Sequence, residues 1–190
     1  MLAGIQRAWI VAVLTCLVRK SSIVFCLLLL WPFGAAQADA GEVAAAVDPE
    51  QLALIDQYGE AGGLATDADG LQVAIVVSAK RLRRLKPWEE AIRDIDTEVP
   101  IVRVADVPRT APTEYDSVAE KLRKRLPPDV NVLVDLDGVW AAAYALDVNV
   151  PNVLIFDGAG TLLAVHSGMF RKSYAEALQA DLEPEPAAGS

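Results

Sequence analysis

The chain has two cysteines, and both lie near its N-terminus, at Cys16 and Cys26. A thiolate is the attacking group in disulfide exchange and a common ligand for metal ions. Residues 39–190 contain no cysteine. This part of the chain can therefore form no internal disulfide, present no thiol nucleophile and offer no thiolate to a metal.

A cluster of basic residues stands out against an acidic background. It puts five cations into seven positions: Lys80, Arg81, Arg83, Arg84 and Lys86. Residues 39–190 carry 14 basic and 26 acidic residues, a formal charge of −12, which argues against a nucleic-acid partner. We place the cluster at the start of a predicted helix, where backbone N–H groups favour anions. It therefore predicts a site for an anionic ligand or an acidic protein. The alternative is a solvated helix face that pairs with Glu89, Glu90 and Asp94.

Other residue types that often do chemistry have simpler explanations. His166 is the only histidine, and we interpret it as a strand-end residue without a catalytic role. Three aspartates follow predicted strands beside glycines: Asp135, Asp137 and Asp157. One interpretation of this placement is a cation site. Asx–Gly turn chemistry accounts for them more simply. We expect no metal site and no cofactor.

Alternating strand and helix patterns must position these residues. Residues 71–78 form a nearly continuous apolar run, which is typical of a strand buried on both faces of a sheet. Residues 80–95 then carry one apolar stripe at helical spacing. Trp88 in this helix and Trp140 in a later one are predicted to be core anchors.

The rest of the chain continues the same alternation. Further strands are predicted at 99–104, 130–134, 152–156 and 161–166, the last two forming a hairpin. Further helices are predicted at 49–58, 113–126, 139–146 and 171–182. The pattern predicts an α/β fold in which a mixed sheet is flanked by helices.

The N-terminal segment has the features of an export signal. Arg19 and Lys20 precede the apolar run of residues 22–34, and an Ala-x-Ala sequence ends at Ala38. We predict a signal peptide over residues 1–38, cleaved after Ala38, and a periplasmic or secreted protein. An uncleaved membrane anchor is the alternative. Translation from Met1 and translation from a start near Val18 both remain open.

The domain organisation follows from these assignments. A tether with a short helix spans residues 39–67, the folded domain spans 68–182, and the tail at 183–190 is disordered by composition.

The second half of the chain resembles the thioredoxin superfamily. The resemblance rests on residues 150–157 (VPNVLIFD), followed by Gly160 and Gly168, and it extends over residues 68–182. The segment from Val132 to Pro151 looks most like the TlpA- and ResA-type envelope proteins, which insert an extra strand and helix before a cis-proline. The resemblance implies that Pro151 is that cis-proline, and that the Val150–Pro151 loop lines the family's site.

The family's redox motif is degenerate in this chain. Thioredoxins carry Cys-x-x-Cys after the first core strand, with a proline further along the helix. Counting back from Pro87 puts Ala79, Lys80, Arg81 and Leu82 at the motif. We therefore expect a non-catalytic binding or accessory protein of the cell envelope. Its partner is expected to be a protein or an anionic ligand that contacts residues 79–84, the Val150–Pro151 loop and the loop at 168–170.

Two alternatives stay open. The family name implies a thiol-disulfide oxidoreductase or a peroxiredoxin-like enzyme. A purely structural subunit would instead copurify with its complex in fixed stoichiometry. The sequence does not predict an oligomeric state.

Overall fold

The computed structural model describes residues 48–66, 69–110 and 112–183. They all belong to one compact unit, Gly41–Ser190. The predicted signal peptide, the start of the tether and the tail after Glu183 lie outside the described residues. Within the described ranges, no helix is both long enough and apolar enough to cross a membrane.

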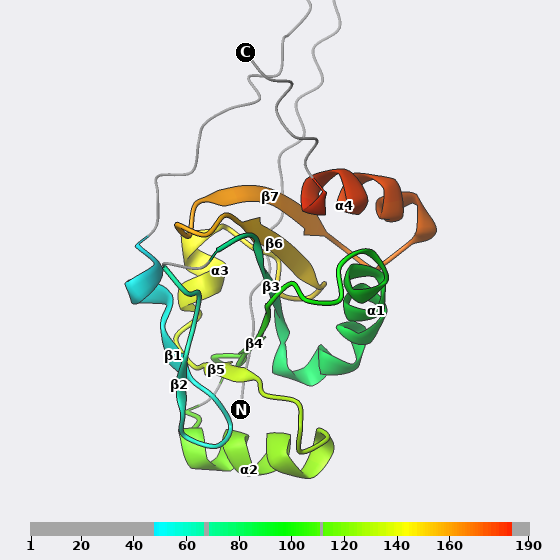
Figure 1. Cartoon of the computed structure of the whole chain (residues 1–190). Helices are drawn as coiled ribbons and strands as arrows, with labels where there is room; N and C mark the ends of the chain where they lie inside the picture. The colour runs from blue at the N-terminus through cyan, green and yellow to red at the C-terminus, as the bar shows by residue number, and fades with distance from the viewer. Residues whose placement is uncertain (1–47, 67–68, 111, 184–190) are drawn as a thin grey trace, which may run out of the picture. The chain divides into compact units, whose positions relative to one another are not determined.

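Five strands of the described chain form one mixed sheet, in the order β5-β4-β3-β6-β7 (Figure 1). The parallel part consists of β3 (Gln72–Ser78), β4 (Ile101–Asp106) and β5 (Leu133–Asp135). The antiparallel part adds β6 (Asn152–Phe156), beside β3, and β7 (Leu162–Ser167), at the edge. Every residue of β3 is buried, as its continuous apolar run predicts.

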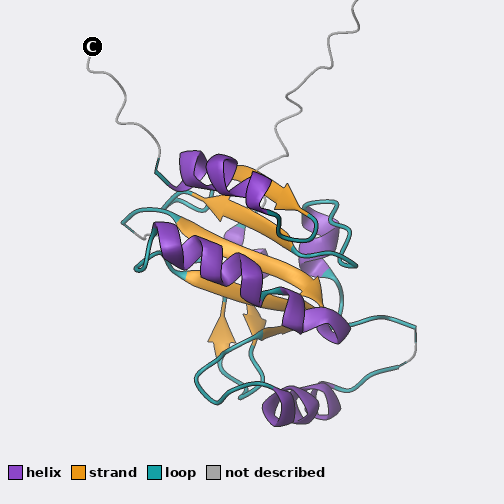
Figure 2. Ribbon diagram, turned by 90° about the vertical axis from the view of Figure 1, so that its right-hand side faces the viewer, coloured by secondary structure: helices purple, strands orange, loops and turns teal. Residues whose placement is uncertain are grey.

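Helices cover both faces of the sheet, and one further helix lies beyond its edge. On one face lie α1 (Lys86–Ile95) and α4 (Ala175–Leu182), as Figure 2 shows, and the core between them and the sheet contains Trp88. On the other face, α3 (Val139–Ala143) packs around Trp140. The helix α2 (Tyr115–Arg125) lies below β5 in Figure 1 and forms a smaller apolar cluster. Both tryptophans are completely buried, which confirms their predicted role as core anchors.

The helix predicted over residues 49–58 is wrong. A single 3-10 turn, η1 (Pro49–Leu52), leads into a small hairpin of β1 (Leu54–Ile55) and β2 (Ala61–Gly62). Asp56 makes the turn, because its Oδ1 accepts hydrogen bonds from the N–H groups of Tyr58 and Glu60. Gly59 has a φ of 89°, a conformation that favours glycine and ends any helix.

The predicted helix over residues 80–95 is divided. A 3-10 turn, η2 (Ala79–Arg84), comes first and contains non-helical backbone angles at Arg81. Only after it does α1 begin, at Lys86, with Pro87 in its first turn. Proline is tolerated there because the first N–H groups of a helix have no partner within the helix. The remaining strands and helices agree with the predicted ones to within about three residues at most ends; the last helix begins with the 3-10 turn η3 (Lys172–Tyr174).

Candidate functional site

Three chain segments that the sequence analysis assigns to the family's site meet in the structure. They are residues 79–84, 148–151 and 168–170, and we call them the three-segment surface. The N–H of Ser78 donates to the carbonyl of Val148 at 2.8 Å, and Arg84 donates to the carbonyl of Asn149 at 2.9 Å. The N–H of Gly168 donates to the carbonyl of Pro151 at 2.9 Å. These bonds tie the end of β3 to both loops.

Asn152 holds the middle loop in place, and the sequence analysis did not single it out. Its buried amide group donates to the carbonyls of Asp147 and Val150, at 2.9 and 3.0 Å. Its carbonyl oxygen accepts from Ser167 Oγ at 2.7 Å. The sequence feature that could have identified Asn152 is its amide side chain at the start of an otherwise apolar strand.

The expectation of a cis Val150–Pro151 bond is wrong. All peptide bonds of the described residues are trans. Trans is the more stable form even before proline, by about 0.5–1 kcal/mol. The bonds that Asn152 makes to the loop carbonyls are formed with this trans geometry. Pro151 itself is buried and directly precedes β6.

The two positions that the sequence analysis assigns to the family's cysteines serve hydrophobic packing. Ala79 packs against the cluster beneath α2, which contains Val118 and Leu122. Leu82 packs against the same cluster and also against the core around Trp88. Both side chains are half-buried. Neither position carries a group that can donate, accept or ionise.

The basic cluster lies ahead of the helix and not at its N-terminus. Four of its five residues belong to η2, and only Lys86 belongs to α1, so the helix-dipole argument does not apply to most of the cluster. Lys86 pairs with Glu90 at 3.5 Å, as the solvated-face alternative predicts. Glu89 instead pairs with Arg103 on β4, at 2.7 Å.

The loop beside the cluster carries one acid with a perturbed pKa. The backbone N–H and the side-chain amide of Asn149 hold the pKa of Asp147 below its usual value, with a smaller contribution from the charge of Arg81.

His166 is fixed by contacts on the α4 side of the sheet. Its Nε2 lies 2.7 Å from Asp181 Oδ2, and its side chain is 10% exposed. Its ring lies 6.2 Å from that of Trp88 and 6.4 Å from that of Tyr174. Trp88 in turn donates from Nε1 to the carbonyl of Gly168 at 3.0 Å, which joins α1 to the three-segment surface.

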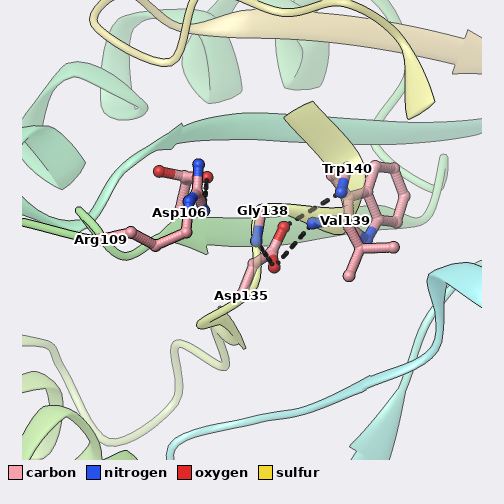
Figure 3. A network of polar contacts seen from close by, with 6 residues as sticks. All are labelled: Asp106, Arg109, Asp135, Gly138, Val139 and Trp140. Atoms are coloured by element: carbon pink, nitrogen blue, oxygen red, sulfur yellow. Dashed lines mark hydrogen bonds and ion pairs between the residues drawn. The ribbon is translucent and has the colours of Figure 1, made fainter. Parts of the chain in front are cut away.

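The predicted Asx turn is confirmed for Asp157, whose Oδ1 accepts from the N–H of Ala159, two residues on, at 3.0 Å. Asp135 instead accepts from N–H groups three to five residues on, at the start of α3. Asp135 is completely buried and accepts from the N–H groups of Gly138, Val139 and Trp140, at 2.6, 3.0 and 3.1 Å (Figure 3). Hydrogen bonds from the backbone N–H groups of its own turn, chiefly that of Thr161, hold the pKa of Asp157 below its usual value. Asp137 is exposed. Across the described ranges, no group of three or more His, Cys, Asp or Glu side chains is placed to hold a metal ion.

A second buried acid, Asp106, was missed by the sequence analysis. It ends β4 directly opposite Asp135 on β5, and it is 2% exposed. Burial raises its pKa, although the ion pair with Arg109 at 3.2 Å opposes the shift. Figure 3 shows the Arg109 side chain near Gly138. A side chain at Gly138 would require the Arg109 guanidinium to move, and the φ of 70° at Gly138 itself favours glycine. An aspartate at the end of an apolar strand was the only sequence signal.

Comparisons with known proteins support the fold. No protein-family profile matches the chain, and no curated protein matches it. Among solved structures, the N-terminal domain of PilB from Neisseria gonorrhoeae has a TM-score of 0.54 at 15% identity, over 73% of this chain and 93% of that one. Yeast Sco1 has a TM-score of 0.54 at 13% identity, over 78% and 100%.

A third solved structure is the exposed lipoprotein thioredoxin Etrx1 from Streptococcus pneumoniae. It has a TM-score of 0.52 at 16% identity, over 67% of this chain and 96% of that one. The narrower resemblance to TlpA- and ResA-type proteins stays a prediction. At these identities the similarity concerns the fold alone, and with the strand order described above it shows that the chain has a thioredoxin-like fold.

Proposed function

We propose that this chain is an exported protein that uses the thioredoxin-like fold for binding and carries out no thiol chemistry. The observation that carries the proposal is the identity and packing of the two residues at the redox positions. Ala79 and Leu82 stand there, and both pack against apolar clusters. Disulfide exchange and thiol peroxidase chemistry each need a thiolate, and residues 39–190 contain no cysteine.

The three-segment surface is the proposed place of binding. Its loops are held to β3 and α1 by the hydrogen bonds of Ser78, Arg84 and Trp88, so its shape is fixed before a partner arrives. Preorganisation of this kind lowers the entropy cost of association. Met169 is 44% exposed on this surface and offers an adaptable apolar contact.

A role in the cell envelope completes the proposal. It is supported by the basic, apolar and Ala-x-Ala sequence of residues 19–38. It is also supported by the similarity to a thioredoxin that is described as an exposed lipoprotein. The alternative, a thiol-disulfide oxidoreductase or peroxiredoxin-like enzyme, would need a cysteine from outside residues 39–190.

The test is an assay of redox activity. The protein, purified in the form that the cell accumulates, should neither reduce insulin disulfides nor consume peroxide in a thiol-coupled assay. A thioredoxin serves as the positive control and the thiol alone as the blank. Turnover above that blank in either assay would refute the proposal. Copurification with one complex at fixed stoichiometry would favour a structural subunit.

A further inference from the structure

A groove runs beside the three-segment surface, between η2 and the end of α2. Its first part has a volume of about 610 Å³. One wall is formed by Ala79, Leu82 and Leu85, and the other by Leu126, Pro127 and Val130. The groove thus has apolar walls contributed by segments about forty residues apart in the sequence.

The groove is strongly basic. Its lining includes five cations: Lys80, Arg83, Lys86, Arg103 and Arg125. Glu89 is the one acidic residue of the lining, and its carboxylate is already paired with Arg103. Within the described part of the chain, Lys80, Arg83 and Arg125 form no ion pair with a carboxylate. These three side chains are exposed, although residues 39–190 carry a formal charge of −12. Three of the five cations of the lining therefore have no carboxylate partner among the described residues.

The groove extends into a second hollow. This hollow has a volume of about 350 Å³ and shares Ala79, Lys80 and Arg125 with the first. This continuation adds another cation, Lys121, and the apolar side chains of Val107 and Val118. Lys80 and Arg125 thus lie where the two hollows meet. Two joined hollows with cations in both fit a chain-like anion better than a compact one.

We propose that this groove binds an acidic peptide segment of a partner protein, in which carboxylates alternate with apolar side chains. The carboxylates would pair with Lys80, Arg83 and Arg125, and the apolar side chains would cover Leu82 and Leu126. A lipid surface is a poorer fit, because a flat bilayer cannot reach between two walls. A simple anion would leave the apolar walls exposed. The inference rests on the proposed binding function and names the class of partner.

The experiment starts from a random peptide library displayed against the immobilised protein. We expect the enriched peptides to combine aspartate or glutamate with leucine, valine or phenylalanine. A labelled enriched peptide is then titrated by fluorescence anisotropy at low and moderate salt. Its affinity should fall with salt, because exposed charge pairs are screened over about 8–10 Å at ordinary ionic strength. Polyglutamate should bind more weakly, since it cannot fill the apolar walls.

Two matched variants locate the binding. The groove variant is Lys80→Glu/Arg83→Glu/Arg125→Glu, and the control is Lys124→Glu/Arg171→Glu/Lys172→Glu. All six side chains are exposed, so both variants change the net charge equally without disturbing the core. The groove variant should weaken peptide binding at least about tenfold, which corresponds to about 1.4 kcal/mol. The control should change it by less than about threefold, since it leaves the groove intact.

Several results would overturn the inference. They are the absence of enriched acidic peptides, an equal loss of affinity in both variants, and binding to vesicles rich in phosphatidylglycerol with no binding to any peptide. Self-association that the groove variant abolishes would assign the groove to a second copy and would equally reject the partner peptide. The redox assay is separate: a redox-silent protein without peptide binding refutes only the groove.

Discussion

Replacing Asp135 with alanine should destabilise the domain strongly. The two carboxyl oxygens of Asp135 accept three backbone N–H bonds, and those from Gly138 and Trp140 are buried. A buried N–H without an acceptor costs about 1–3 kcal/mol, so two of them cost about 2–6 kcal/mol. Entry of water into the space left by the side chain recovers part of this. We therefore expect Asp135→Ala to lower the free energy of unfolding by about 2–4 kcal/mol.

Urea unfolding monitored by circular dichroism measures this effect. Asp137→Ala is the matched control, because Asp137 lies two residues away and is exposed. Its free energy of unfolding should lie within about 0.5 kcal/mol of the wild-type value. Asp135→Asn keeps one acceptor oxygen and should fall between the two, which provides a measurement if the alanine variant does not fold. The reasoning is wrong if the Asp135→Ala variant folds and its free energy of unfolding lies within about 0.5 kcal/mol of the wild-type value.

Three further predictions concern the pH dependence of stability and the hydrogen bond of Trp88. Burial raises the pKa of Asp106 above its usual 3.8, so the folded protein favours the protonated acid. The free energy of unfolding therefore falls as pH rises from 3.8 through the raised pKa. Asp106→Asn should therefore gain stability relative to wild type over that interval, in unfolding experiments at a series of pH values. Asp157→Asn should show the opposite trend, because the lowered pKa of Asp157 contributes stability above 3.8 that is lost in acid; equal trends would contradict both assignments. Trp88→Phe removes the donor to a loop carbonyl and should cost about 1–3 kcal/mol by thermal or urea unfolding; a neutral result would show that this bond does not hold the loop.

The sequence predicted those elements whose pattern is local. The run at 72–78 is apolar at almost every position, and no other element of this length satisfies such a pattern as well as a buried strand. Trp88 and Trp140 occupy apolar positions of helical stripes, and both are buried anchors. The order of strands and helices then restricted the fold to a mixed sheet with helices on both faces.

The features that were missed depend on contacts between distant residues. The hairpin at 54–62 forms because Asp56 fixes the turn, while Tyr115 from α2 donates to the Asp56 carbonyl. Asp106 looks like any strand-end aspartate in the sequence, and it is buried only because β5 pairs beside it. The groove was not predictable because Leu82 and Leu126 become its two walls only when α2 takes its place beyond β5.

The contacts of Leu82 have a consequence for how this scaffold can change over evolutionary time. One side chain touches both the core beneath α1 and the cluster beneath α2, so it joins two parts of the interior that are otherwise separate clusters. A cysteine there would be smaller by roughly a methylene or two, and each buried methylene contributes about 0.8 kcal/mol. Introducing a thiol at position 82 would therefore weaken the packing between the two clusters before a second cysteine could pair with it. The packing of Leu82 therefore opposes the stepwise introduction of a cysteine pair at positions 79 and 82 of this scaffold.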